Sequence, residues 1–120
     1  MPNPYNAPEI SPKEVAEKLD RGDNFILLDV REPHELAHAS LPQGTFQLVP
    51  LSELAARLTD ALPQEVQADR DREIVVMCHH GLRSAQVTAW LRQQGWTRVF
   101  SMAGGIDAYA QEVDPSVGTY

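Results

Sequence analysis

The sequence contains little cysteine, little positive charge and no long apolar run, and each shortage excludes a class of protein. One cysteine among 120 residues excludes an internal disulfide and most zinc-finger schemes, and it fits a reducing compartment. The formal net charge of -7 argues against a nucleic-acid partner, because phosphate binding needs a basic face. No apolar run approaches the length of a membrane span, and residues 1–8 lack the basic start and apolar core of a secretory signal. We therefore expect a cytoplasmic protein that binds neither nucleic acid nor a membrane.

The length and composition indicate one globular domain. A chain of 120 residues that is 42% hydrophobic and 22% charged can bury one sizeable core. No internal repeat divides the chain. We expect the domain to span residues 1–120, with a Pro/Asn-rich flexible lead-in at residues 1–8 and a tail at residues 113–120.

Short apolar runs alternate with helical patterns along the chain. We expect strands at residues 9–10, 25–30, 46–49, 73–78 and 98–100. Helices are expected at residues 12–21, 34–39, 52–62, 84–94 and 105–113, with a polar linker at residues 63–72. Ser11 and Ser52 are the expected N-caps of two of these helices, and Gly22 ends the first. The alternation predicts an α/β fold in which a mainly parallel sheet has helices on both faces, with its chemical site beyond the carboxyl ends of the strands.

The only cysteine opens a compact loop between a predicted strand and a predicted helix. This loop reads Cys78-His79-His80-Gly81-Leu82-Arg83-Ser84. Successive backbone N–H groups around Gly81 can converge on one point, and the positive end of the following helix is directed there as well. A thiolate at Cys78 would be stabilised by these amides, by the helix terminus and by Arg83. We interpret Cys78 as a nucleophile; the alternative is an inert, buried cysteine that ends a core strand.

The other loop residues are interpreted by their place around the thiol. Arg83 is the second candidate catalytic residue, and it either binds the substrate or points away and pins the loop. We expect the remaining loop residues to bind substrate, namely His79, His80, Gly81, Leu82 and Ser84. The two histidines either tune substrate entry and protonate a leaving group or are exposed loop side chains. Ser84 is expected to be the N-cap of the following helix and not a second nucleophile.

Asp29 and Arg31 end a different predicted strand, and we expect them to support the structure. Asp29 would fix the strand end and the amides of the loop. Arg31 would pair with a carboxylate, with Glu32 and Glu73 as the candidates, because Asp/Arg pairs at strand ends usually serve the architecture.

The segment His34-Glu35-Leu36-Ala37-His38 matches H-E-x-x-H, the pattern of zinc metalloproteases. We do not favour a metal site, because the expected helix is short, follows a strand and a proline, and has no evident third ligand. His79 and His80 are adjacent, so an extended backbone would direct them away from each other. The preferred interpretation is a half-exposed helix with two surface histidines, and we expect neither a metal nor another cofactor.

The spacing between Cys78 and Arg83 separates two kinds of chemistry. It is C-x4-R, whereas tyrosine phosphatases use a loop of the form C-x5-R. A phosphoryl group needs a wide ring of amides around its equatorial oxygens, while a single sulfur atom needs a narrower one. The shorter loop therefore favours a persulfide on Cys78 over a bound phosphate.

With its flanking motifs, the chain resembles a single-domain rhodanese, a sulfurtransferase, from about Ile10 to Tyr120. The resemblance rests on residues 27–32, 34–35, 50–51, 75–84, 91, 95–96 and 102–109. Residues 112–117 and Tyr120 also resemble the rhodanese modules fused to adenylyltransferases that activate ubiquitin-like sulfur carriers. The crossover at residues 38–45 departs from the Gly-His-Ile-Pro-Gly-Ala stretch of many family members, which should alter a rim of the site and not its chemistry.

The resemblance implies a five-stranded, mostly parallel sheet between helices and a transferred sulfur carried on Cys78 as a persulfide. It implies a thiosulfate or persulfide donor and a thiophilic acceptor, which is a small thiol, cyanide in an assay, or a sulfur-carrier protein. An alternative is a persulfide carrier that delivers sulfur for cofactor or tRNA thiolation. A phosphatase or arsenate reductase on a similar scaffold is a third possibility, which the loop length disfavours.

Overall fold

The computed structural model describes residues 3–120, and its five strands form one sheet. The strands are β1 (Glu9–Ile10), β2 (Ile26–Asp29), β3 (Gln47–Leu48), β4 (Ile74–Met77) and β5 (Val99–Met102). They lie in the order β1-β5-β4-β2-β3, and each neighbouring pair is parallel. The predicted five-stranded, mostly parallel sheet is therefore confirmed.

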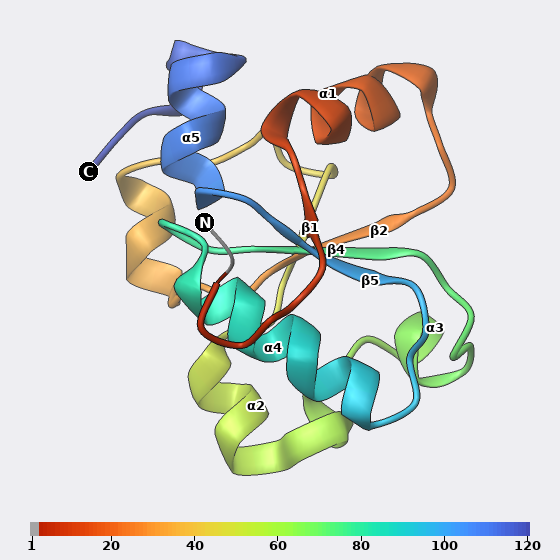
Figure 1. Ribbon diagram of the computed structural model, residues 1–120. Coiled ribbons are helices and arrows are strands. Elements are labelled where there is room, and N and C mark those ends of the chain that lie inside the picture. The colour runs from red at the N-terminus through yellow and green to blue at the C-terminus, as the bar shows by residue number, and fades with distance from the viewer. Residues whose placement is uncertain (1–2) are drawn as a thin grey trace.

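Helices cover both faces of this sheet, as the alternation predicted. The α-helices are α1 (Pro12–Arg21), α2 (Leu51–Arg57), α3 (Gln64–Gln67), α4 (Leu82–Gln93) and α5 (Gly105–Glu112). Three 3-10 helices complete the fold: η1 (Pro33–Ala37), η2 (Leu58–Ala61) and η3 (Pro115–Val117). Figure 1 shows α1 and α5 on one side of the sheet and α2, α3 and α4 on the other. Within residues 3–120, no helix has the length and apolar character needed to cross a bilayer.

Strands β2 and β4 lie inside the sheet and are buried on both faces, which explains why their sequences are continuous apolar runs. Successive side chains of a strand point to opposite faces. Leu28 and Val76 accordingly belong to the core cluster shared with α2, α3 and α4, while Leu27 and Val75 belong to the cluster shared with α1 and α5. The sheet thus separates two cores, and the site lies at the edge where both end.

The caps predicted for α1 are confirmed. The Ser11 side chain accepts a hydrogen bond from the Glu14 amide at 3.1 Å, and Pro12 is the first helical residue. Gly22 ends the helix with φ +69°, a left-handed conformation that glycine adopts without steric cost.

The predicted cap and length of the second long helix are wrong. Pro50 precedes α2, so Ser52 lies inside the helix, where its hydroxyl donates to the Glu32 carboxylate at 2.6 Å. The helix ends at Arg57, because Leu58, the first residue of η2, has a φ of +55° that breaks the α-helical path. Glu32 thereby joins α2 to η1, a link that the local pattern could not show because twenty residues separate the two.

Two further segments differ from the prediction. The helix expected at residues 34–39 is the shorter 3-10 helix η1, in which Glu32 and Glu35 form a reciprocal capping box. The expected polar linker at residues 63–72 contains α3, because Val66 is fully buried and its carbonyl accepts a hydrogen bond from the Trp96 indole at 2.9 Å.

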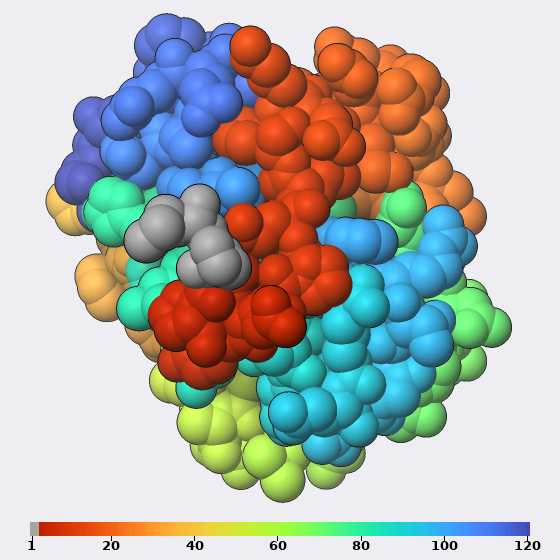
Figure 2. All heavy atoms as spheres, viewed as in Figure 1, coloured from red at the N-terminus to blue at the C-terminus, as the bar shows by residue number. Residues whose placement is uncertain are grey.

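Both ends of the described chain are tied to the fold. Residues 1–2 of the expected lead-in lie outside the described residues; in the rest of it, the Asn3 side chain accepts from the Ala7 amide at 2.9 Å and the Pro8 carbonyl accepts from the Ser101 amide at 2.8 Å. In Figure 2 the red atoms of this segment form part of the molecular surface. The tail passes through η3 and brings Tyr120 back to the carboxyl edge of the sheet.

Candidate active site

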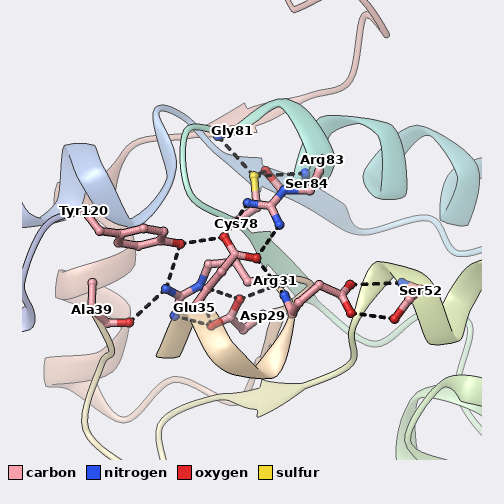
Figure 3. Close-up of polar contacts among 11 residues, drawn as sticks. Asp29, Arg31, Glu35, Ala39, Ser52, Cys78, Gly81, Arg83, Ser84 and Tyr120 are labelled. Carbon is pink, nitrogen blue, oxygen red and sulfur yellow. Dashed lines mark hydrogen bonds and ion pairs between the residues drawn. The ribbon is translucent and has the colours of Figure 1, made fainter. Parts of the chain in front are cut away.

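Cys78 directly follows β4 at the carboxyl edge of the sheet, and its sulfur faces the loop that it opens. Sγ accepts hydrogen bonds from the Gly81 amide at 3.1 Å and from the Ser84 amide at 3.3 Å (Figure 3). Gly81 has φ +99°, and this conformation turns the chain into α4. The predicted arrangement of strand, tight loop and helix start around the thiol is therefore present.

Four loop amides remain available around this sulfur. Within residues 3–120, the N–H groups of His79, His80, Leu82 and Arg83 have no hydrogen-bond acceptor. Leu82 and Arg83 are the first residues of α4, where the helix itself supplies no acceptor and its dipole adds partial positive charge. The loop therefore offers donors for one small anion beside Sγ.

Cys78 is itself almost fully buried, with 1% of its surface exposed. It belongs to the core cluster on the α4 side, so burial alone would fit an inert cysteine. The two amide hydrogen bonds distinguish it from one, because they direct polar loop groups at the sulfur. A pocket of about 190 Å³ does lie elsewhere, between α2 and α4, but none of residues 78–84 lines it.

Ser84 does not have the role that the sequence predicted. Gly81 is the N-cap of α4, and Ser84 lies inside the helix with its hydroxyl fully buried. The Cys78 thiol donates to Ser84 Oγ at 3.4 Å, and Ser84 Oγ lies 2.8 Å from Ser101 Oγ on β5. A thiolate can only accept, so Ser84 would then donate to Sγ and Ser101 to Ser84.

The start of α5 holds the loop from the opposite side. The Ile106 amide donates to the Cys78 carbonyl at 2.8 Å, and the Asp107 amide donates to the His79 carbonyl at 3.1 Å. Gly105, with φ +64°, allows this approach: a Cβ there would lie 2.5 Å from the Cys78 carbonyl oxygen. The Gly104-Gly105 pair is therefore needed for close backbone contact, and not only as a helix start.

Arg83 is engaged by a carboxylate. Its guanidinium donates to both oxygens of Glu35, at 2.7 and 2.9 Å. The hydrogen bonds from Arg83 are the main reason that the pKa of Glu35 lies far below its usual range, and the same pair raises the pKa of Arg83. Of the two predicted orientations, the structure shows Arg83 fixed to η1.

Arg31 pairs with Asp29, and not with the predicted Glu32 or Glu73. Asp29 accepts from the Arg31 guanidinium, with Nη2 to Oδ2 at 2.7 Å, and both side chains have 0% exposure. The Arg31 backbone turns after the strand so that its side chain folds back to Asp29 two residues earlier. The same guanidinium donates to the Ala39 carbonyl at 2.8 Å and to the Tyr120 hydroxyl at 3.1 Å.

Tyr120 links the two ion pairs. Its hydroxyl accepts from Arg31 and donates to Glu35 at 2.8 Å (Figure 3). Glu35 and Tyr120 lie 48 and 85 positions from their partners Arg83 and Glu35, so periodicity and spacing gave no signal for this network. In the sequence, Glu35 was notable as part of the H-E-x-x-H pattern and of the family resemblance, and neither indicated its partners.

The loop histidines are part of an aromatic stack. The ring centroid of His79 lies 3.8 Å from that of His80 and 3.7 Å from that of Tyr120, with His38 a further 5.5 Å from Tyr120. Burial and the neighbouring His80 lower the pKa of His79, which favours the neutral form of the stacked ring. His80 and Leu82 are exposed.

One group of side chains could approach a metal ion. Ligand atoms of His79, His80 and Asp107 lie within 4.8 Å of one another. The two imidazoles are stacked face to face, however, and imidazole nitrogens coordinate in the plane of the ring. Their lone pairs therefore do not converge on one ion in this arrangement.

Comparisons with known proteins agree with the geometry. The model of the rhodanese-like domain family matches residues 11–112. A thiosulfate sulfurtransferase from Haemophilus influenzae is 37% identical over 112 residues, which cover 93% of this chain and 96% of that protein. A solved structure of a human single-domain sulfurtransferase is 29% identical with a TM-score of 0.71, over 88% of this chain and 97% of that one.

Similarity also extends to parts of larger proteins from Arabidopsis thaliana. A rhodanese-like/PpiC domain-containing chloroplast protein is 40% identical over 98 residues, which cover 82% of this chain and 31% of that protein. An adenylyltransferase and sulfurtransferase is 32% identical over 120 residues, which cover 92% of this chain and 25% of that protein. The predicted resemblance to modules of such adenylyltransferases is confirmed.

Proposed function

The chain belongs to the rhodanese-like domain family and is a sulfurtransferase, and we propose that Cys78 carries the transferred sulfur as a persulfide. The observation that carries this proposal is the loop around Cys78. Two amides bind Sγ, and four more amides lie on the same short loop without an acceptor. Such a ring of donors suits the outer sulfur of a Cys–S–S⁻ group.

In the first half-reaction the Cys78 thiolate attacks the outer sulfur of the donor. The bond from Sγ to that sulfur forms, the sulfur–sulfur bond of the donor breaks, and the leaving group departs with the electron pair. Thiosulfate would leave as sulfite, and a persulfide R–S–SH would leave as the thiolate RS⁻. The enzyme retains one sulfur atom: thiosulfate leaves it as Cys78–S–S⁻, and R–S–SH leaves it as Cys78–S–SH, which gives the same anion when it loses its proton. The loop amides and the start of α4 stabilise this anion.

In the second half-reaction a thiophilic acceptor takes the outer sulfur and restores the thiolate. Cyanide in an assay, a small thiol or a sulfur-carrier protein can fill this role. Because a covalent enzyme form separates the two halves, the kinetics should be of the double-displacement type. We place this chemistry in the cytoplasm, since a lone functional thiol needs a reducing compartment.

The loop residues have different parts in this proposal. Cys78 is the nucleophile, and the backbone of the substrate-binding residues supplies the donors. Arg83 holds the loop through Glu35, and Asp29 with Arg31 supports the strand end beneath it. His79 and His80, whose rings stack on each other, would contact the incoming donor.

A second role is favoured by one comparison. Similarity to the sulfurtransferase part of an adenylyltransferase supports delivery of the persulfide sulfur to a partner protein. The chemistry at Cys78 is the same in both roles, and only the acceptor differs.

Mass spectrometry tests the persulfide directly. After incubation with thiosulfate, the protein should gain one sulfur atom, about 32 Da, that dithiothreitol removes. The Cys78→Ser variant should gain nothing and lose sulfur transfer to background, because its hydroxyl cannot form a persulfide, while its circular dichroism stays that of the wild type. Cys78 is the only cysteine, so a sulfur gain that survives in the variant would contradict the assignment.

A further inference from the structure

The side chain of Tyr120 is linked to the Cys78 loop near both of its ends. Its ring stacks on the imidazole of His79, the residue after Cys78, with centroids 3.7 Å apart and an interplanar angle of 6°. Its hydroxyl donates to Glu35 Oε1 at 2.8 Å, and the same oxygen accepts from Arg83 Nη2 at 2.9 Å. One residue of the tail thus reaches the start of the loop directly and its far end through one carboxylate.

Tyr120 is itself held in place, although 38% of its surface is exposed. Its hydroxyl accepts from Arg31 Nη1 at 3.1 Å, and Arg31 is fully buried (Figure 3). The tail is also fixed before Tyr120, because the Val117 carbonyl accepts from the Ser40 amide at 2.9 Å. Gly118, with φ +94°, allows this close approach, since a Cβ there would lie 2.6 Å from a carbonyl oxygen of the crossover. The ring and the hydroxyl therefore have set positions from which they can orient the loop.

The ring of His79 depends on this stacking for its orientation. Its Nε2 is buried and has no hydrogen-bond partner within residues 3–120. Its other stacking partner is His80, whose side chain is 64% exposed and moves more freely. A stacked aromatic pair contributes about 0.5–1.5 kcal/mol beyond its buried area. Loss of the Tyr120 ring would therefore leave His79, which directly follows the nucleophile, with an exposed ring as its stacking partner.

The Tyr120 hydroxyl acts on the other end of the loop. Glu35 Oε2 accepts from the Glu32 amide at 2.8 Å and from Arg83 at 2.7 Å, while Oε1 accepts from Arg83 and Tyr120. Each carboxylate oxygen thus has two donors, and removal of the hydroxyl leaves Oε1 with one. The pair between Glu35 and Arg83 would survive this loss, so the hydroxyl should have a smaller effect than the ring.

We propose that Tyr120 is a positioning residue for sulfur transfer, an inference that rests on the persulfide proposed above. It acts through the loop and not on the sulfur itself, because it fixes His79 directly and Arg83 through the carboxylate. Of the two amides that bind Sγ, that of Gly81 lies between these residues and that of Ser84 follows them. A loop released at either end would hold both donors less firmly, and small displacements at a reacting centre lower rates steeply.

Two substitutions separate the ring from the hydroxyl. Tyr120→Phe keeps the stack and should lower the rate constant of persulfide formation by about threefold. Tyr120→Leu loses both contacts and should lower it by roughly tenfold or more. Rapid quenching and mass spectrometry, with saturating thiosulfate, give this rate constant and the final sulfur content per chain. A positioning role lowers the rate constant at full sulfur content, whereas a merely structural role lowers the folded fraction, and hence the sulfur content, at an unchanged rate constant.

Tyr5→Phe and Tyr5→Leu are the matched controls. Tyr5 is 41% exposed, its ring stacks on no other ring within residues 3–120, and both variants should keep the wild-type rate constant. A Tyr120→Leu variant with the wild-type rate constant, whatever its sulfur content, overturns the inference. A Tyr120→Phe variant with the wild-type rate constant overturns the part assigned to the hydroxyl, and it overturns the whole inference if Tyr120→Leu does not fold. Wild-type protein that gains no sulfur would refute the persulfide instead, so the two failures are distinguishable.

Discussion

At the end of β2 the Asp29 and Arg31 side chains are fully paired, whereas at the end of β4, its neighbour in the sheet, several backbone amides have no acceptor within residues 3–120. The two ends are level, because Asp29 on β2 is in register with Met77 on β4. Beyond β2, Arg31 donates to Asp29, to the Ala39 carbonyl and to Tyr120, with no exposure to solvent. Beyond β4, four amides of the Cys78 loop have no acceptor among the described residues 3–120. The side chains at one end are therefore satisfied by the protein itself, and the other end keeps donors that a bound anion can use.

This difference gives the two strand ends different roles: the residues beyond β2 support the fold, and the loop beyond β4 holds the candidate nucleophile. Buried polar groups are costly unless they are hydrogen-bonded, so a fully paired cluster gives a rigid support. Donors on such a support keep a fixed position, as the Gly81 and Ser84 amides do at Sγ, and stabilisation of an anion requires such fixed donors. The link between the two ends is Glu35, which binds Arg83 of the loop and the Tyr120 hydroxyl of the supporting network.

The largest effect is expected where the paired end is broken. Asp29→Asn leaves the Arg31 charge buried without its partner and should lower the free energy of unfolding by about 3–5 kcal/mol, as measured by urea denaturation. Asp23→Asn is the matched control, because Asp23 pairs with Arg21 at the surface. Its denaturation midpoint should stay close to that of the wild type. Equal midpoints in the two variants would contradict a supporting role for Asp29.

A smaller effect is expected where α5 touches the loop. Gly105→Ala would place a Cβ against the Cys78 and His79 carbonyls, so the loop must move and the rate of persulfide formation should fall by roughly tenfold or more. Gly44→Ala imposes a similar left-handed strain at φ +90° with nothing within 4 Å, and should keep the rate. A stopped-flow measurement of sulfite release compares them. Equal rates in both variants would show that α5 does not set the loop geometry.

The smallest effect is expected for the buried hydroxyl of Ser101, which contacts Cys78 only through Ser84. Ser101→Ala removes the hydroxyl that would donate to Ser84 when Cys78 is a thiolate, and should slow alkylation of Cys78 by roughly two- to tenfold. The loss should disappear in a Ser84→Ala background, since Ser101 acts only through Ser84. Thr88→Val, which removes another fully buried hydroxyl from α4, should leave the rate unchanged. An additive loss in the double variant would contradict the relay.

Much of the fold could be predicted from the sequence, because its elements are local. Strands β2 and β4 correspond to apolar runs, and the caps of α1, Ser11 and Gly22, directly flank the helix in the sequence. The predicted N-cap at Ser84 failed because a glycine with positive φ, Gly81, starts the helix earlier than a serine would. The predicted linker failed because one buried residue, Val66, is enough to anchor a short helix.

The site was predictable only where its residues are contiguous. Cys78, Gly81 and the free amides belong to one loop and follow from its spacing. Glu35 and Tyr120 are brought to that loop by the crossover after β2 and by the tail, and local spacing does not show with which residues they pair. The predicted partners of Arg31 were the adjacent Glu32 and the distant Glu73, and both are wrong because the turn after β2 folds the Arg31 side chain back onto Asp29.

The contact between α5 and the loop also bears on the order in which the molecule assembles. The hydrogen bonds to the Cys78 and His79 carbonyls cannot form before the Ile106 and Asp107 amides are in place. These amides lie more than twenty positions later in the chain, beyond the whole of β5. Within residues 3–120, β1 likewise pairs only with β5, near the far end of the sequence. A nascent chain that has not yet docked α5 therefore lacks the contacts that fix the Cys78 loop, and the loop takes its final form only when the fold is complete.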